Sequence, residues 1–231
     1  LGLVGSEMCI RDRYRGKLMV MPRCAIESYD DFAWTYTPGV AEPCKIIHKD
    51  VEQVWWYTAR WNYAAVVSDG SRVLGLGNIG PEAGLPVMEG KAVLFKYLGG
   101  VDAFPLVTRA NTVDEMVKFL EWIEPNFGAI NLEDIEKPKC FDVLEEARKR
   151  LQICVWHDDQ QGTATVVYAG LKNALKIVGK KLDEVKIVFF GFGAANKKCA
   201  DVLLLAGAKS ENMIIVDSKG ALGLHLSLIH I

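Results

Sequence analysis

The hydrophobic residues of this chain gather in short runs that end in acidic residues or glycines, and amphipathic segments follow them. Short apolar runs bounded by turn-forming residues are typical of buried strands, whereas apolar positions recurring every three or four residues are typical of helices. Strands that alternate with helices predict an α/β fold with parallel sheets. The apolar runs are YAAVVSDG, AINLEDI, QICVWHDD, KIVFFGFG and MIIVDSKG, and the helical patterns cover Thr112 to Ile123, Cys140 to Arg150, Thr163 to Val178 and Ala195 to Leu205.

A boundary between two domains is expected at Gly179. This glycine follows the third helical pattern and suits the left-handed position that closes a helix, and the polar turn KKLDE comes after it. We therefore expect a first α/β domain over residues 14–178 and a second, incomplete one over residues 179–225.

The two ends of the chain look foreign to the rest. One short DNA sequence, read in its two directions, can encode both MCIRD near the start and LSLIHI at the finish. That DNA resembles a transposase adaptor used in preparing sequencing libraries. We expect residues 1–13 and 226–231 to be adaptor-derived and leave them out of the reasoning on fold and function. The remainder would then be a fragment cut at both sides.

Composition narrows the class of protein. The 231 residues carry a net charge of −2, which gives no electrostatic reason to expect a nucleic-acid partner or an anionic membrane. No apolar run approaches the length of a membrane span. The cysteines outside the two ends are odd in number and lack CxxC spacing, which favours a reducing, cytoplasmic location over a disulfide framework or a zinc site.

Acidic residues stand where several predicted strands end. The carboxyl ends of parallel strands lie at one edge of a sheet, which is where ligands bind. Glu133, Asp134 and Asp159 would form an all-oxygen site of the kind that Mg²⁺ or Mn²⁺ prefers. Neighbouring residues of a strand face opposite sides, so Glu133 and Asp134 can share a cation only if the strand ends before them. An ordinary surface strand end is the alternative, and a helix N-cap would account for Asp158 or Asp159 but not for both.

Three further side chains are candidates for chemistry. Lys91 falls on the apolar face of a predicted helix, together with Met88, Phe95 and Leu98. It is either a packing residue whose ammonium reaches water, or a partly buried general base with a lowered pKa.

Tyr36 and Arg72 also have two interpretations each. Tyr36 precedes an extended Thr37-Pro38 step and a turn; it either packs or donates a proton. Arg72 follows a predicted strand end, where it is either solvated or suited to bidentate binding of a substrate carboxylate.

A glycine-rich turn predicts a dinucleotide site for NAD or NADP. The sequence GFGAAN follows a predicted strand and opens a helix, as a pyrophosphate-binding turn does. Asp217 ends the next strand 24 residues after Gly193 (217 − 193), close to the spacing of a ribose-binding acid, and it would repel a 2′-phosphate. The third glycine position holds Asn196. A second glycine pattern, GLGNIG, lacks this strand–helix context and predicts a structural turn. The expected cofactor-binding residues are Gly191, Gly193, Ala194, Ala195, Asn196 and Asp217.

As a set, these motifs resemble the malic enzymes in the shorter form found in prokaryotes. The matching segments are YTPGVAEPC, SRVLGLGNIGPEAGLPVMEGKAVLFKYLGGVDAFP, INLEDI and HDDQQGTA, and the resemblance covers nearly all of Tyr14 to Leu222. It implies an enzyme that oxidises L-malate with NAD⁺ or NADP⁺ and decarboxylates it to pyruvate, using Mg²⁺ or Mn²⁺. It also implies a malic-enzyme-type substrate and metal domain, the start of a truncated Rossmann domain, and a homodimer or larger homo-oligomer.

The resemblance assigns roles residue by residue. It makes Tyr36 the general acid, Lys91 the general base and Arg72 a contact to malate. Asp158 would support Lys91. The same resemblance gives the metal to Glu133, Asp134 and Asp159, and the pyrophosphate to the turn from Gly191 to Asn196. Gln161 departs from the family pattern, since many prokaryotic relatives have histidine there.

Two other functions remain open. A different cytosolic NAD(P)-dependent dehydrogenase, acting on a hydroxy acid or an amino acid, would need no carboxylate-bound metal. A non-catalytic nucleotide-binding module would need no lysine base.

Overall fold

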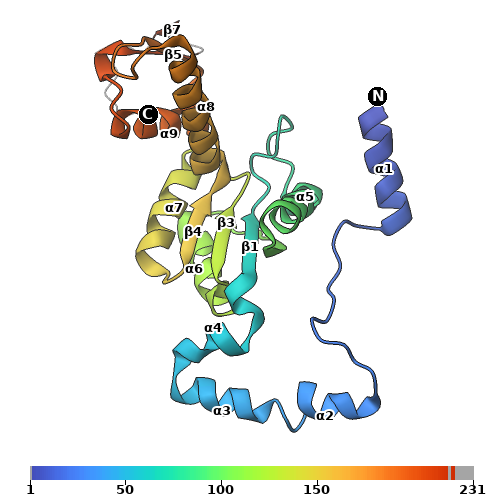
Figure 1. Ribbon diagram of the computed structural model, residues 1–231. Coiled ribbons are helices and arrows are strands. Elements are labelled where there is room, and N and C mark those ends of the chain that lie inside the picture. Colours follow the sequence, from blue (N-terminus) through green and yellow to red (C-terminus); the bar gives the residue numbers. More distant parts are fainter. Residues whose placement is uncertain (1, 218–219, 222–231) are drawn as a thin grey trace.

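Two β-sheets organise the chain in the computed structural model, which describes residues 2–217 and 220–221 (Figure 1). The first sheet has four parallel strands in the order β2-β1-β3-β4, and the second has the order β5-β6-β7. In the second sheet β5 and β6 are parallel, whereas β7 runs antiparallel to β6. The strands are β1 (Tyr63–Ser68), β2 (Asp102–Val107), β3 (Ala129–Leu132), β4 (Cys154–His157), β5 (Ile187–Phe190), β6 (Met213–Asp217) and β7 (Gly220–Ala221).

The first sheet is covered on both faces, which explains why its central strand reads as a continuous apolar run. In β1, Ala64 and Val66 pack with α5 (Pro81–Gly99). Ala65 and Val67 pack on the other face with α6 (Val113–Ile123) and α7 (Lys139–Arg150). A parallel strand buried on both sides needs apolar residues at every position rather than at every second one.

The four predicted helices are confirmed to within one residue at each end. Helix α6 begins after Thr112, whose hydroxyl accepts a hydrogen bond from the Glu115 amide, while the Glu115 carboxylate accepts one from the Thr112 amide. Helix α8 (Thr163–Val178) ends at Gly179, which takes the expected left-handed conformation with φ 64°. Helix α9 (Ala194–Leu205) follows the glycine turn after β5.

Strand β2 lacks a recognisable sequence signal because it contains Pro105. Proline has no N–H to donate, so within sheets it is restricted to edge strands, strand starts and bulges. The order β2-β1-β3-β4 places β2 at the edge, where the missing donor leaves no partner unsatisfied.

The second sheet is covered on one face by α8 and α9. Phe189, Cys199 and Leu203 are buried there, and Ala164 of α8 joins them. The opposite face leaves Val188, Phe190 and Ile214 exposed. The domain boundary at residues 178/179 stays a prediction.

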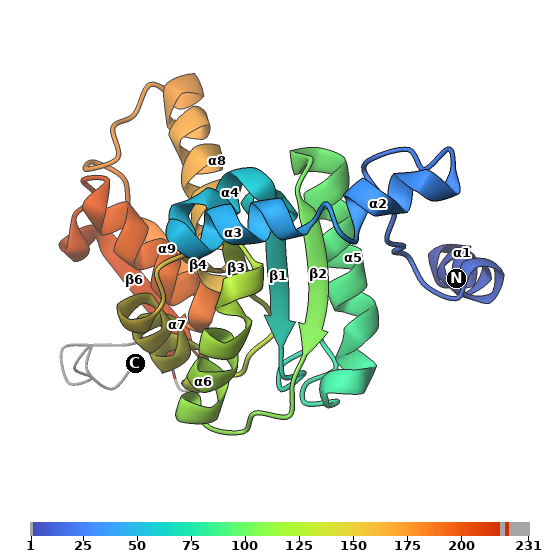
Figure 2. The same ribbon diagram turned by 90° about the horizontal axis from the view of Figure 1, so that it is seen from below.

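Residues 28–62, which directly precede β1, form an arm that lies beyond the amino ends of the first sheet (Figures 1 and 2). Its helical segments contain no buried residue. They are the 3₁₀ turns Tyr29–Asp31, Val51–Gln53 and Ala59–Asn62, and the helices α2 (Phe32–Thr35), α3 (Ala41–Lys49) and α4 (Val54–Tyr57).

Helix α1 (Gly2–Tyr14) contains most of the first stretch expected to be adaptor-derived, and Arg11 pairs with Glu89 of α5 at 2.5 Å. The other expected stretch, residues 226–231, lies outside the described residues. The remaining short turns are Glu124–Asn126 and Ser210–Asn212. No helix in the described part of the chain is long and apolar enough to cross a membrane.

The expected apolar face of α5 is wrong at one position, and this gives a stability test. Met88 is fully buried, whereas Leu98, predicted to share its face, is 77% exposed. We predict that Met88→Ala lowers the free energy of unfolding by about 2–5 kcal/mol because it leaves a cavity. Leu98→Ala in the same helix should change it by no more than about 0.5 kcal/mol. Denaturant titration of both variants measures the difference, and equal losses would contradict this packing.

Candidate active site

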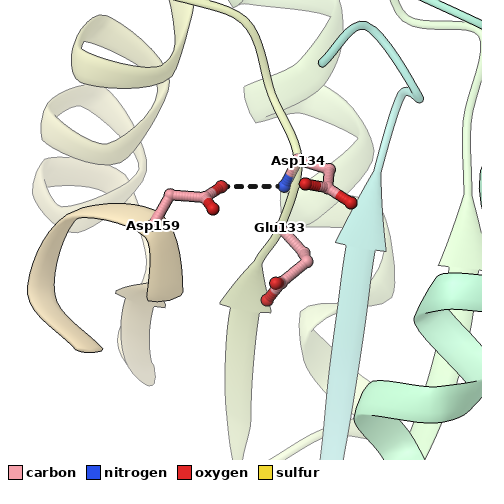
Figure 3. A group of neighbouring side chains, drawn as sticks. All are labelled: Glu133, Asp134 and Asp159. Carbon is pink, nitrogen blue, oxygen red and sulfur yellow. Dashed lines mark hydrogen bonds between the residues drawn. The ribbon is translucent and has the colours of Figure 1, made fainter. Parts of the chain in front are cut away.

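Three acidic side chains converge at the carboxyl edge of the first sheet. Glu133 and Asp134 follow β3 and are buried, with exposures of 5% and 6%, and Asp159 comes from the turn after β4. One carboxylate oxygen from each lies within 4.8 Å of the others. Figure 3 shows Asp159 turned towards Asp134, whose backbone amide donates a hydrogen bond to Asp159 Oδ2 at 3.0 Å.

The condition for Glu133 and Asp134 to share one site is met. Strand β3 ends at Leu132, and Asp134 takes a left-handed conformation with φ 53°. Few residues other than glycine adopt this region, and aspartate is among the more tolerant. The Arg72 amide donates a hydrogen bond to the Asp134 carbonyl at 3.0 Å and holds the turn. The side chains of Glu133 and Asp134 therefore need not point to opposite faces of the sheet, as they would within a strand.

Burial raises the pKa values of both acids. The pKa of Glu133 rises to about 7 because of desolvation, against which Lys91 and Asn131 act. The pKa of Asp134 rises to about 6 because of desolvation and the neighbouring Asp159 carboxylate. Asp134 Oδ2 is buried and has no hydrogen-bond partner. An all-oxygen cluster with surplus negative charge and an unsatisfied oxygen fits a hard divalent cation such as Mg²⁺ or Mn²⁺.

Lys91 turns its ammonium into this cluster rather than out to water. Its Nζ lies 2.7 Å from Asp158 Oδ2 and 3.2 Å from Glu133 Oε1, and its side chain is 22% exposed. Burial alone would lower the pKa of Lys91, but these two carboxylates outweigh it and raise the pKa above its ordinary value. In the chain by itself the pKa of Lys91 is thus raised, and the lowered pKa of a general base stays a prediction for the site with a cation bound.

Asp158 and Asp159 contact different partners because they lie on a π-helical turn, where the side chains of consecutive residues point in different directions. The segment Asp158–Gly162 winds as a π-helix between β4 and α8, so Asp158 reaches Lys91 while Asp159 reaches Asp134. Such turns are frequent at functional sites. A Cβ on Gly162 would overlap Asp158 Oδ1 and come within 2.9 Å of its Cγ. The glycine therefore leaves room for the Asp158 carboxylate.

Asn131 and His157 also belong to the site, and sequence reasoning missed both. Asn131 Nδ2 donates a hydrogen bond to Glu133 Oε2 at 2.9 Å. Their separation by two residues at the end of a strand is the signal that could have revealed this contact. His157 is fully buried, and its Nδ1 lies 4.0 Å from Asp159 Oδ2. Burial lowers the pKa of His157, although the nearby Asp159 and Asp158 carboxylates act in the opposite direction.

A buried ion pair holds the loop that carries Arg72. Asp69 Oδ2 lies 2.5 Å from Lys139 Nζ, and Asp69 Oδ1 accepts a hydrogen bond from the Ser71 hydroxyl at 2.6 Å. Ser71 Oγ also accepts a bond from the Glu136 amide at 2.8 Å, which ties the loops after β1 and β3 together. Arg72 itself is exposed, and its Nη1 donates to the Leu74 carbonyl at 2.6 Å. Lys139 lies 70 residues after Asp69 (139 − 69), so no local pattern could predict the pair.

One cleft joins the acidic cluster to the glycine turn. It encloses about 1230 Å³, and Lys91, Glu133 and Asp159 line it together with Gly191 and Gly193. Gly191 has φ 84°, and a Cβ on either glycine would meet no atom within 4 Å. The open turn at the start of α9 fits a dinucleotide phosphate, because helix N-termini present backbone N–H groups to anions.

The remaining cofactor candidates lie around this turn. Ala194, Ala195 and Asn196 also line the cleft. Asn196 Nδ2 donates a hydrogen bond to the Gly191 carbonyl at 2.7 Å, so this residue closes the turn in place of the third glycine. Asp217 ends β6, as expected.

The structure does not bring Tyr36 to the cleft. Tyr36 follows α2 in the arm, is 69% exposed and is absent from the described residues that line the cleft. Within one chain, therefore, the expected general acid and the expected general base are apart.

Family models and known proteins match most of this chain. Residues 15–112 match the model "Malic enzyme, N-terminal domain", and residues 160–223 match "Malic enzyme, NAD binding domain". A Bacillus subtilis protein named bifunctional malic/malolactic enzyme is 50% identical over 208 residues, which cover 90% of this chain and 50% of that protein. A Geobacillus stearothermophilus protein named NAD-dependent malic enzyme is 48% identical over 207 residues, which cover 90% of this chain and 43% of that protein.

Solved structures match as well. The crystal structure of Entamoeba histolytica malic enzyme has a TM-score of 0.91 at 42% identity and covers 95% of this chain and 46% of its own. That of the NAD-dependent malic enzyme from Thermotoga maritima has a TM-score of 0.89 at 45% identity and covers 94% of this chain and 57% of its own. The chain thus spans half or less of the length of these curated relatives.

We predict opposite stability effects for two Gly→Ala substitutions at the start and middle of α8. Gly170 lies in the helix with open space around its Cβ position, so Gly170→Ala should add roughly 0.5–1 kcal/mol to the free energy of unfolding. Gly162 also has helical backbone angles, but its substitution should destabilise the chain because the new methyl group displaces Asp158 from Lys91. Denaturant titration measures both changes, and stabilisation by Gly162→Ala would refute the steric argument.

Proposed function

Because this chain belongs to the malic enzyme family, we propose that it forms the malate- and metal-binding part of an enzyme that oxidises L-malate to pyruvate and CO₂ with reduction of NAD⁺ or NADP⁺. One observation carries the proposal. The cluster of Glu133, Asp134 and Asp159, the Lys91–Asp158 pair and the glycine turn all meet at one cleft.

The metal is assigned to Glu133, Asp134 and Asp159, which offer oxygen ligands in a buried and negatively charged setting. When bound, Mg²⁺ or Mn²⁺ supplies a Lewis acid that stabilises negative charge on a substrate oxygen. Asn131 and the Asp134 amide orient two of these carboxylates in advance.

Lys91 is proposed as the base that removes the C2 hydroxyl proton of malate while hydride leaves C2 for the nicotinamide. Asp158 holds its ammonium in place at 2.7 Å. Glu133 now keeps the pKa of Lys91 high, but it exerts less attraction once its charge is shared with a cation, and burial then favours the neutral amine. Arg72, at the mouth of the cleft, is proposed to bind a malate carboxylate.

Decarboxylation leaves an enol that needs a proton at C3, and Tyr36 is proposed as the donor. The dinucleotide is assigned to the turn from Gly191 to Asn196 and to Asp217, whose negative charge favours NAD⁺ over NADP⁺. We also propose that the protein works as a homodimer or larger homo-oligomer.

An activity assay tests the function. We predict that a full-length protein that contains this chain shows malate-dependent reduction of NAD⁺ or NADP⁺ in the presence of Mn²⁺, with release of pyruvate and CO₂. Excess EDTA should abolish the activity, because the substrate oxygen loses its Lewis acid. Full activity in EDTA would favour a dehydrogenase of another family.

In the full-length protein, Lys91→Ala should reduce malate oxidation by roughly two to four orders of magnitude, the usual contribution of a general base. Lys96→Ala is the matched control, because Lys96 lies in the same helix but pairs with Asp102 away from the cleft. The control should stay within a few-fold of wild type. Steady-state kinetics decide the matter, and a Lys91→Ala enzyme as active as the control would show that this lysine is a packing residue.

Mn²⁺ affinity separates the roles of the two adjacent acids. Asp159→Asn should weaken Mn²⁺ binding at least about tenfold, since it removes a proposed ligand. Asp158→Asn should weaken it much less, because Asp158 contacts Lys91 instead. Isothermal titration calorimetry without substrate gives both constants, and the reverse ranking would overturn the assignment.

A further inference from the structure

A second cavity lies between α7, which covers the first sheet, and α9, which covers the second. It encloses about 370 Å³, within the range of roughly 300–1,000 Å³ that is usual for small-molecule sites. Both helices line it, together with Gln160 of the π-helical turn. Among the described residues, none lines both this cavity and the cleft that contains the acidic cluster. The two are therefore separate sites.

Positive charge exceeds negative charge in this cavity, although the chain as a whole carries a net charge of −2. Lys197 and Lys198 share one carboxylate, since Asp201 Oδ2 lies 3.3 Å from the first ammonium and 3.9 Å from the second. Arg148 also lines the cavity and forms no ion pair with any residue that the structure describes. Three cations against one carboxylate leave a surplus of two positive charges.

The other charged side chains of the cavity are already balanced. Lys149 Nζ lies 2.9 Å from Glu145 Oε1 and also 2.9 Å from Glu146 Oε1. All three residues belong to α7, so this cluster forms without any contribution from α9. An anion that enters the cavity therefore interacts mainly with the three cations that lack a carboxylate of their own.

The unpaired arginine is held in position, and an apolar surface lies beside the charges. Arg148 Nε donates a hydrogen bond to the Val155 carbonyl at 3.0 Å, which fixes the guanidinium and leaves its Nη groups for a ligand. Phe141 and Leu144 also line the cavity, and Lys197 Nζ lies 5.7 Å from the Phe141 ring centroid. The cavity therefore fits a ligand that carries an anionic group next to a carbon group.

We propose that this cavity binds a small organic phosphate. The phosphate group lies against Arg148, Lys197 and Lys198, because guanidinium and ammonium groups are the usual partners of phosphate. The carbon part lies against Phe141 and Leu144. A phosphate monoester carries a charge of about −1.5 to −2 at pH 7, which matches the surplus of two positive charges. A single carboxylate would leave one of these charges unbalanced.

A ligand in this cavity would join both halves of the structure. Arg148 belongs to α7, whereas the two lysines belong to the first turn of α9, directly after the glycine turn. Gln160 is buried next to Asp159, and its Nε2 donates a hydrogen bond to the Cys140 carbonyl of α7 at 3.3 Å. The bound phosphate thus holds α7, α9 and the π-helical turn together without entering the metal or dinucleotide site.

Calorimetric titration with phenyl phosphate tests the site in the full-length protein that contains this chain. The titration is run without metal and with saturating dinucleotide, so that the glycine turn is occupied. One molecule of phenyl phosphate should bind per chain. Inorganic phosphate should bind several-fold more weakly because it lacks the ring, and benzoate about tenfold more weakly because it carries one charge. Either probe binding as tightly as phenyl phosphate would overturn the assignment.

Substitutions locate the probe. Lys198→Ala and Arg148→Ala should each weaken phenyl phosphate binding about tenfold, because each removes a charge-assisted contact. Lys149→Ala is the matched control, since its ammonium lines the same cavity but is already paired, and it should change the affinity less than about threefold. Circular dichroism verifies folding. Lys198→Ala leaves the contact between Arg148 and Val155 intact, so it decides the matter if Arg148→Ala does not fold.

Two results would overturn the inference. One is binding that disappears when the dinucleotide is added, which would place the probe at the glycine turn. The other is binding that Lys198→Ala weakens no more than Lys149→Ala does, which would place it elsewhere on the surface. The titration contains no malate, so a protein that binds phenyl phosphate but does not oxidise malate would refute the proposed function alone.

Discussion

The contact of Lys91 with Asp158 and Glu133 is the interaction on which the site depends. Glu133, Asp134, Asp158 and Asp159 stand together at the carboxyl edge of the first sheet, and burial disfavours the charged forms of the first two. The single ammonium of Lys91 cannot balance their negative charge, and the pKa values of Glu133 and Asp134 are raised. Ionisation of Glu133 works against the folded state as the pH rises from 4.5, its ordinary pKa, to about 7. A bound divalent cation would remove this penalty, so metal affinity and chain stability are linked at the same residues.

Rigid elements, rather than a flexible loop, hold the charged groups in place. Lys91 comes from α5, Glu133 from the end of β3, and Asp158 from the π-helical turn before α8. Glu133 and Asp158 also rely on local backbone features, the left-handed Asp134 next to one and the small Gly162 beside the other. A cluster of this kind keeps its geometry before a ligand arrives, which is what a preorganised catalytic site requires.

Segments outside the first sheet also contribute residues to the cleft. The first sheet and its helices supply Lys91 and the acidic residues of the cleft, and the turn after β5 supplies Gly191 and Gly193. Tyr36 follows α2 in the arm and does not line this cleft.

The sequence by itself determined the parts of this protein that follow from periodicity, turn chemistry and local spacing. It predicted the α/β class, four helices to within a residue, Gly179 as a helix end, and the acids at the ends of the strands. It could not reveal β2, because Pro105 is unusual in a strand. It could not reveal the arm either, because short helices with no buried residue show no periodic apolar pattern. The Asp69–Lys139 pair and the ring of contacts around Lys91 were also out of reach. These contacts depend on which strand ends become neighbours. Asp69 and Lys139 are 70 residues apart, so no local sequence pattern indicates that their side chains approach to 2.5 Å. Only the tertiary structure decided that Lys91 faces two carboxylates and that Tyr36, at the end of α2, does not line the cleft, because both facts depend on which distant segments of the chain pack together.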